Sequence, residues 1–280
     1  MSFLNNLFRY FRHALIRTWE LFPRVANEVE LTELDFWLVC HSKDAATALL
    51  TIESIKKNSL NSVRKIYLVG NEKERPSWLS DEDVIYIWEG ELPVTQIVVD
   101  TLKGSPYMGW VLQQVLKYSG VEHSDRFVVI DCDTVLLKKH AFFDADTSLL
   151  RLAYEHSPHY KMFERSLGVN AAPFLSFTCH MMPYQGSVLK NLLKNIETKH
   201  GVHWARYFAE YARDHGMVVN EQDLYARYLI STGSPVRFVP WLNKTVPFSA
   251  NENIQDLAQR HSNRNCVSLH NNEDRKLIIN

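Results

Sequence analysis

Short continuous apolar runs alternate with stretches of helical periodicity along the first half of this chain. Apolar runs of this length are typical of strands buried on both faces, and they occur at 36–40, 65–69, 84–88 and 127–130. Between them, apolar residues recur at helical spacing over 45–57 and 109–118. Strands that alternate with helices predict an α/β fold with a mostly parallel sheet flanked by helices. Ligands of such sheets bind beyond the carboxyl ends of the strands.

The second half of the chain has a less regular and mostly helical pattern. The expected strands are 176–181, 236–239 and 266–269, and the expected helices are 187–200, 203–215 and 221–231. No repeat, low-complexity tract or linker separates the two halves. We therefore expect a single domain over residues 34–280 with a helical C-terminal half.

Residues 1–26 differ from the rest and are expected to form a basic amphipathic helix. Its apolar stripe consists of Leu4, Leu7, Phe8, Phe11, Leu15, Trp19 and Phe22. Four arginines against one glutamate give the first 24 residues a net charge of +3. Such a helix suits the anionic surface of a membrane. A helix packed on its own domain or on a second subunit is an equal alternative, and an organelle transit peptide is a weaker third.

Charge, cysteine spacing and the length of the apolar runs argue against several classes of protein. The 31 basic and 32 acidic residues leave a net charge of −1, so no overall attraction to nucleic acid is expected. The four cysteines stand far apart without a CxxC pair, which argues against a zinc finger or a disulfide scaffold. Each lies in or beside an expected apolar strand, which predicts core positions. No apolar run is long enough to span a bilayer. We expect a cytoplasmic protein, peripheral on the inner face of the membrane if residues 1–26 bind lipid.

The strongest chemical signal is the sequence Asp131-Cys132-Asp133 directly after the apolar strand 127–130. Two carboxylates at i and i+2 leave a strand on the same side. Carboxylates held so close repel each other unless a cation joins them. Oxygen ligands of this kind suit Mg²⁺ or Mn²⁺, which keep positions open for substrate phosphates. The motif predicts a metal–diphosphate site; a solvated loop is the alternative.

An Asp-x-Asp motif after a strand has two well-known uses. Haloacid-dehalogenase-like phosphatases place a nucleophilic aspartate first and a threonine two residues after the second aspartate. Here Thr134 follows Asp133 immediately, and three expected strands precede the motif. Both points favour the other use, the DxD motif of nucleotide-sugar glycosyltransferases. A phosphatase with Asp131 as nucleophile stays the alternative.

Residues 34–280 resemble glycosyltransferases of the GT-A type, most closely a bacterial group found with surface-polysaccharide genes. The resemblance is carried by Gly109–Lys117, Asp131–Asp133, Ser176–Met181, Asn220–Tyr225 and Leu269–His270. It implies a Rossmann-like sheet in which 34–140 bind a nucleotide-sugar donor, most simply a UDP-sugar, and 141–280 bind the acceptor. It further implies a saccharide or lipid-linked glycan acceptor in capsule or lipopolysaccharide synthesis. A non-catalytic carbohydrate-binding member of the fold is a further alternative.

The resemblance also implies ligands for the metal and the diphosphate. His270 follows a short apolar strand where many such enzymes keep a third metal ligand, so Asp131, Asp133 and His270 would hold Mn²⁺ or Mg²⁺. Lys276, six residues on, or Arg275 would grip the diphosphate. The glycine and Pro-Trp that accompany such a lysine in glycogenin-like enzymes are missing here.

Further donor contacts are expected from two places. His41, Lys43 and Asp44 follow the first strand and would border the base and ribose, although Ser42 or Asp44 serves equally well as a helix cap. Gln113 and Lys117 lie one turn apart on the helix before the DxD strand. Lys117 would reach a phosphate or a sugar carboxylate, against the alternative of a plain helix surface.

Three residues are candidates for acid–base chemistry near the acceptor, away from the metal. His180 lies on the strand that lines the acceptor side in GT-A enzymes, and Glu221 and Asp223 begin a helix. A carboxylate near the acceptor hydroxyl would act as the base of an inverting transfer. The alternative for Glu221 is a capping role at the positive end of the helix.

Overall fold

The computed structural model describes residues 31–153, 163–169, 175–216, 219–249 and 251–270. The expected helix 1–26 and the basic residues Arg275 and Lys276 lie outside these ranges.

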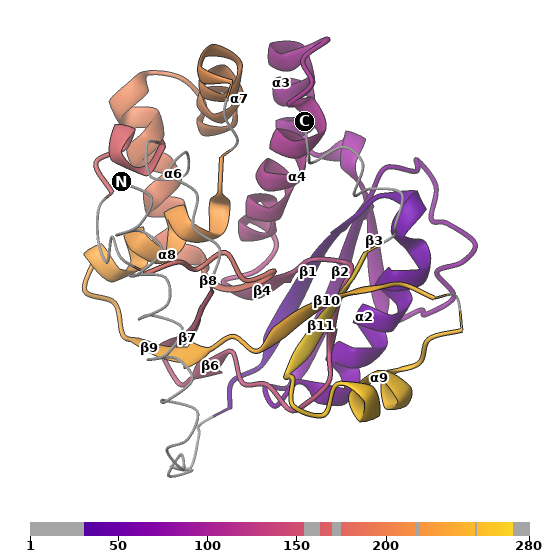
Figure 1. Cartoon of the computed structure of the whole chain (residues 1–280). Coiled ribbons are helices and arrows are strands. Elements are labelled where there is room, and N and C mark those ends of the chain that lie inside the picture. The colour runs from indigo at the N-terminus through magenta and orange to yellow at the C-terminus, as the bar shows by residue number, and fades with distance from the viewer. Residues whose placement is uncertain (1–30, 154–162, 170–174, 217–218, 250, 271–280) are drawn as a thin grey trace, which may run out of the picture.

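A five-stranded sheet in the order β3-β2-β1-β4-β8 forms the centre of the molecule (Figure 1). Its strands are β1 (Leu34–Cys40), β2 (Val63–Gly70), β3 (Val84–Trp88), β4 (Arg126–Ile130) and β8 (Met181–Gln185). The first four strands in this order run parallel, and β8 pairs antiparallel with β4. The predicted α/β class with a mostly parallel sheet is confirmed.

Helices cover both faces of this sheet, which explains the continuous apolar runs. Along β4, Phe127 and Val129 pack with the helices of one face, while Val128 and Ile130 pack with α2 on the other. The first face carries α3 (Pro93–Leu102), α4 (Met108–Tyr118), α6 (Gly186–His200), α7 (Trp204–His215) and α8 (Glu221–Ser231). The second carries α2 (Ala45–Asn58). All four cysteines are buried and free, as predicted.

Two small three-stranded sheets complete the described part of the chain. One has the order β10-β11-β5, with β10 (Asn243–Pro247), β11 (Cys266–His270) and β5 (Thr134–Leu136). The other has the order β6-β7-β9, with β6 (Phe143–Asp144), β7 (Thr147–Leu152) and β9 (Val236–Pro240). The remaining elements are α9 (Ile254–Arg260) and the 3₁₀ turns η1 (Ser42–Asp44), η2 (Glu89–Glu91) and η3 (Ser119–Glu122). The Asp131–Asp133 segment is the link between the large sheet and the β10-β11-β5 sheet.

The expected strand 176–181 is wrong. Residues 175–180 are irregular, and β8 begins only at Met181. His180 has a φ of 59°, which interrupts an extended strand. The C-terminal half is also richer in strands than its pattern indicates, and α3 was not expected. None of the helices within the described ranges combines the length and apolar character that crossing a bilayer requires.

Candidate metal centre

The two aspartates lie at the carboxyl edge of the large sheet, as their position after an apolar strand predicts. β4 is held between β1 and β8, and Asp131 follows it directly. The backbone N–H of Asp131 donates to the carbonyl of His180 at 2.9 Å. The chain then turns, with Thr134 N–H donating to the Asp131 carbonyl at 2.9 Å, and Asp133 leads into β5.

His180 lies beside these aspartates and not away from them as expected. Its Nδ1 is 3.1 Å from Oδ2 of Asp131. One ligand atom each from Asp131, Asp133 and His180 lie within 4.8 Å of one another. These three side chains, named here the Asp–Asp–His cluster, offer two carboxylates and one imidazole. That donor set suits Mn²⁺ or Mg²⁺ with an added nitrogen ligand.

His270 reaches the same place from β11. Leu269 N–H donates to the carbonyl of Asp133 at 2.8 Å, which fixes the end of β11 against the motif. The Nε2 of His270 is 3.6 Å from Oδ2 of Asp133, and this nitrogen is buried without a hydrogen-bond partner. A buried nitrogen without a partner is what a site for a cation at Asp133 requires.

Lys117 lies beneath the cluster and is buried, so it does not form a plain helix surface. Its Nζ is 2.7 Å from Oδ1 of Asp131 and 2.9 Å from Oε1 of Glu221. Burial opposes the charged ammonium, but the two carboxylates outweigh it and raise the pKa of Lys117. Gln114, one turn earlier, donates its amide to Oε1 of Glu221 at 3.1 Å in the orientation that satisfies both groups.

The two aspartates differ in their electrostatic surroundings. Burial opposes ionisation of Asp131, yet Lys117 and the hydrogen bond from His180 hold the pKa of Asp131 well below its usual range. Burial and the neighbouring charge of Asp131 raise the pKa of Asp133. Asp133 therefore has less cationic compensation than Asp131, which is the electrostatic deficit that a bound cation removes.

The start of α8 holds the segment 175–180 through side chains. Asn220 caps α8 by accepting from the N–H of Asp223 at 2.8 Å. Gln222 accepts from the N–H of Cys179 at 2.8 Å, and Asp223 accepts from the N–H of Phe177 at 2.5 Å. Asp223 also faces Arg227, at 3.6 Å.

These contacts change the interpretation of the two α8 carboxylates. The Asp223 side chain is 3% exposed and bonds to the backbone of the segment, so the structure does not bring it to the cluster. The Glu221 side chain is 2% exposed and lies behind Lys117. Sequence reasoning included Gln222 in the Asn220–Tyr225 motif but assigned it no role, because only the tertiary fold brings its amide oxygen to the N–H of Cys179.

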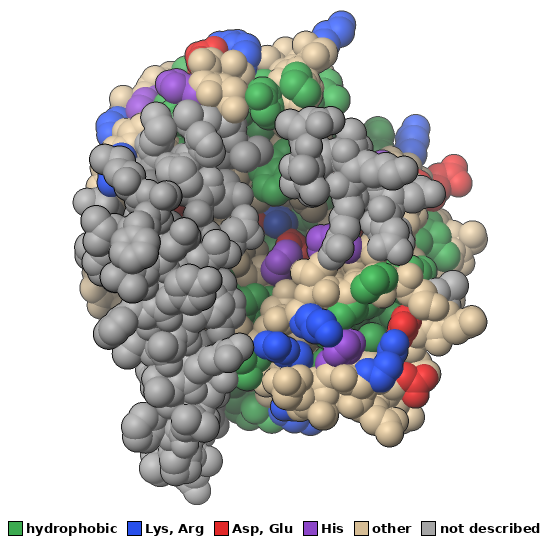
Figure 2. All heavy atoms as spheres, in the orientation of Figure 1, with side chains coloured by type: hydrophobic (Ala, Val, Ile, Leu, Met, Phe, Trp, Pro, Cys, Tyr) green, Lys and Arg blue, Asp and Glu red, His purple; other side chains and the backbone are tan. Residues whose placement is uncertain are grey.

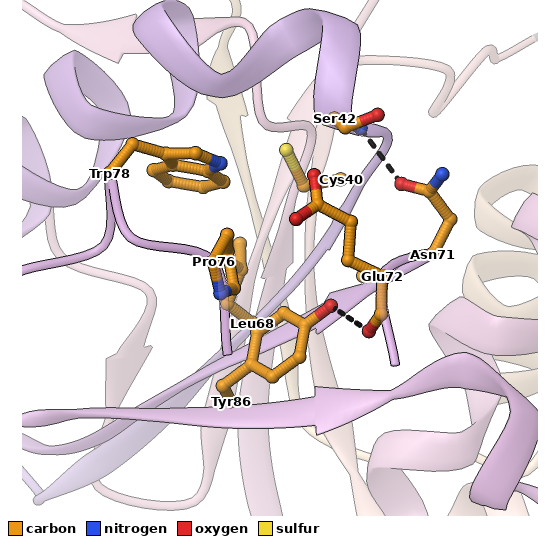
Figure 3. Close-up of a pocket in the computed structure, with 9 residues that line it drawn as sticks. Cys40, Ser42, Leu68, Asn71, Glu72, Pro76, Trp78 and Tyr86 are labelled. Atoms are coloured by element: carbon orange, nitrogen blue, oxygen red, sulfur yellow. Dashed lines mark hydrogen bonds between the residues drawn. The ribbon is translucent and has the colours of Figure 1, made fainter. Parts of the chain in front are cut away.

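A small pocket of about 10 Å³ lies at the carboxyl ends of β1, β2 and β3 (Figure 3). It is lined by Cys40, Ser42, Leu68, Gly70, Asn71, Glu72, Pro76, Trp78 and Tyr86. The Oδ1 of Asn71 accepts from the N–H of Ser42 at 2.9 Å, and the Tyr86 hydroxyl donates to the carbonyl of Glu72 at 2.5 Å.

The expected donor residues after β1 lie beside this pocket. His41 and Lys43 are exposed and Asp44 is half-buried at the start of α2, in the same loop as the pocket residue Ser42. Gln113 is half-buried on α4. Asn71 and Glu72 were not singled out, although they follow an expected strand and thus share the edge at which ligands bind.

The face in Figure 2 is hollowed at its centre, where Lys or Arg, acidic and histidine side chains lie together.

Comparison with known proteins gives distant similarities to solved structures. No protein-family model matches the sequence, and no curated protein matches it. Mouse xyloside xylosyltransferase 1, in its apo form, aligns with a TM-score of 0.47 and 11% identity over 84% of this chain and 97% of that chain. The apo structure of the bifunctional glycosyltransferase WbbM aligns with a TM-score of 0.46 and 10% identity over 88% of this chain. The alignment spans 46% of the WbbM chain, less than half its length. Similarities this low assign no function.

Proposed function

We propose that this chain is a metal-dependent glycosyltransferase of the GT-A type that takes its sugar from a nucleotide-sugar donor. The observation that carries the proposal is the Asp–Asp–His cluster at the carboxyl edge of a mostly parallel sheet. Paired carboxylates at such an edge suit a divalent cation bound to the diphosphate of a nucleotide. The sequence resemblance to GT-A enzymes points to the same chemistry.

We assign the residues around the cluster to two roles, metal binding and positioning. Asp131, Asp133 and His180 would hold Mn²⁺ or Mg²⁺, with His270 as a further ligand at Asp133. A divalent cation there supplies positive charge against the negative charge that develops on the departing diphosphate. Lys117 keeps Asp131 ionised and fixes its orientation, and Glu221 with Gln114 fixes Lys117. Glu221 is thus proposed as a positioning residue.

The donor and acceptor are proposed to occupy opposite sides of the cluster. The base and ribose of the donor, a UDP-sugar, would lie by His41, Lys43 and Asp44 next to the pocket at β1–β3. Gln113, which the sequence suggested as a donor contact, is instead proposed to face the acceptor, on the same helix as Lys117. The acceptor would be a saccharide or a lipid-linked glycan of a bacterial surface polysaccharide. Lys276, outside the described residues, is kept as the proposed diphosphate clamp.

A thermal-unfolding screen tests this function. The full chain is heated with UDP-, GDP-, CMP- and dTDP-sugars, each with and without Mn²⁺, and transfer or hydrolysis is followed in parallel. We expect one diphosphate donor to raise the melting temperature only when Mn²⁺ is present, and Asp131→Asn to remove that rise. A covalent phosphoaspartate at Asp131 would instead establish a phosphatase. No response to any nucleotide would leave a carbohydrate-binding module.

Residues 1–26 are proposed to bring the enzyme to an anionic membrane on the cytoplasmic side. Sedimentation with anionic and with neutral liposomes compares the full chain with a chain that starts at Asn27. We expect only the full chain to sediment, only with anionic lipid, and less at high salt. Equal sedimentation of both chains would contradict the anchor.

A further inference from the structure

One large aromatic side chain near the candidate metal centre is exposed to solvent. Trp110 is 45% exposed, and it is the only aromatic residue among the exposed large hydrophobic residues of the described part of the chain. Its indole Nε1 makes a long hydrogen bond of 3.4 Å to the carbonyl of Val219, which leaves much of the ring uncovered. A single exposed aromatic side chain is common in proteins, so its position relative to the candidate metal centre decides what it indicates.

Trp110 lies on the face of α4 that points to the cluster. Residues at i, i+4 and i+7 of a helix share one face, which here places Trp110 in line with Gln114 and Lys117. All three contact the chain at or just before the start of α8: Trp110 contacts Val219, and the other two contact Glu221. Seven residues of helix rise by about 10 Å, so Trp110 stands two turns beyond Lys117 along the rim of the site.

A polar side chain accompanies Trp110 on α4. Gln113, one turn on from Trp110, is half-buried and offers an amide with donors and an acceptor. Figure 2 shows hydrophobic side chains directly above the charged and histidine side chains of the hollow.

We infer that Trp110 and Gln113 form the binding subsite for a pyranose ring of the saccharide acceptor. A pyranose has a face of C–H groups that packs on an indole and a rim of hydroxyls that bond to an amide, so an aromatic face beside an amide matches it on both counts. The separation from Lys117 leaves room for the transferred sugar between the cluster and the stacked ring. The inference rests on the proposed function, whose substrate class it specifies.

The test compares Trp110→Ala and Trp110→Phe with Leu60→Ala in the full chain. Leu60 is 44% exposed, so its truncation is a matched control for loss of a surface hydrophobic group. The acceptor probes are methyl glycosides of the common hexoses, and the donor is the nucleotide sugar found in the screen above. Three quantities are measured: KM for the acceptor, KM for the donor, and the rate of donor hydrolysis without acceptor. Saturation-transfer NMR of the methyl glycosides reports binding independently of turnover.

We expect Trp110→Ala to raise the acceptor KM roughly three- to tenfold and to weaken the saturation-transfer signal of the same glycoside. The acceptor KM of Trp110→Phe should lie between those of Trp110→Ala and the parent chain. Leu60→Ala should leave the acceptor KM unchanged, and the Trp110 variants should leave the donor KM and the rate of donor hydrolysis unchanged. An unchanged acceptor KM in Trp110→Ala would overturn the inference while donor turnover still supported the proposed function. A raised donor KM would also overturn it and assign Trp110 to the nucleobase. A parent chain that neither binds nor hydrolyses any donor would overturn both.

Discussion

Two segments meet at the candidate metal centre, and they are held in place by different means. β4 delivers Asp131 from the middle of a sheet, where main-chain hydrogen bonds to β1 and β8 fix it. His180 ends the irregular segment 175–180, in which side chains of α8 accept hydrogen bonds from the N–H groups of Phe177 and Cys179. The hydrogen bonds of a main-chain ladder require no particular side chain, whereas those of the second segment require Gln222 and Asp223. Substitution of a side chain therefore removes these backbone hydrogen bonds only in the second segment.

The largest expected effect is at the end of the ladder-held segment. Asp133→Asn keeps the shape of the side chain and removes its charge, so it should lower transfer by about a thousandfold or more, because metal assistance contributes several kcal/mol. Isothermal titration with Mn²⁺ and a steady-state assay check this. Asp83→Asn, at an exposed carboxylate far along the chain, is the control and should change neither quantity. Full activity of Asp133→Asn would exclude the metal centre.

The next effect concerns the lysine that supports this segment from below. Lys117→Met leaves Glu221 buried without its cation, so the free energy of unfolding should fall by about 3–5 kcal/mol. The double variant Lys117→Met/Glu221→Gln removes that buried charge and should recover part of the loss. Urea unfolding without metal measures both. Equal stability of the single and double variants would show that Lys117 and Glu221 are not coupled.

A smaller and more selective effect is expected at the side-chain-held segment. Gln222→Ala leaves the buried N–H of Cys179 without an acceptor, which should cost about 1–3 kcal/mol of stability. Because His180 follows Cys179, the affinity for Mn²⁺ should also fall about 10- to 100-fold, as for other residues that orient metal ligands.

Asn61 offers the matched control for this variant. Its buried amide accepts from the N–H of Phe142 at 2.7 Å, far from the cluster along the chain. The Asn61 amide also bonds to the backbone of Thr32 and Phe143, so Asn61→Ala should cost at least as much stability as Gln222→Ala, without changing Mn²⁺ affinity. Equal Mn²⁺ affinities in Gln222→Ala and Asn61→Ala would contradict a special role for α8.

The smallest effect is on the backbone of His180 itself. A left-handed φ costs a residue with a Cβ about 1–2 kcal/mol, and glycine avoids that cost. His180→Gly should thus be more stable than His180→Ala by about 1 kcal/mol. Both variants lose the imidazole and should bind Mn²⁺ equally weakly. Thermal unfolding and Mn²⁺ titration separate the two properties; a His180→Ala as stable as His180→Gly would remove the argument from strain.

The same contrast explains how much of the fold was predictable. The central strands β1 and β4 of the large sheet are buried on both faces, so their apolar runs stand out. The expected strand 84–88 coincides with β3, an edge strand that is only partly buried. The helix expected over 221–231 coincides with α8. The run 176–181 alternates apolar and polar residues like a half-buried strand, but the N–H groups of Phe177 and Cys179 bond to α8 side chains. The pattern of apolar residues does not show whether N–H groups bond to a neighbouring strand or to side chains.

Part of the candidate site was also predictable from the sequence, and part depends on tertiary packing. Asp131 and Asp133 are two residues apart, so local geometry alone predicts that they lie together. His270 was expected beside them from the family resemblance, and the structure brings it to 3.6 Å from Asp133. The pairing of Lys117 with Asp131 and Glu221 joins residues from three distant parts of the chain. It depends on how α4 packs on α8, which periodicity does not encode. The metal role of these residues stays a prediction.

The link between the large sheet and the β10-β11-β5 sheet has a mechanical consequence. Asp131 ends a strand of the first sheet, and Asp133 precedes a strand of the second. A cation bound by both carboxylates would link the two sheets, so its binding free energy would also stabilise their relative arrangement. Removal of the cation would weaken this link between the sheets. Amide hydrogen exchange should then become faster in β5 and β11, while β1 and β2 keep their protection.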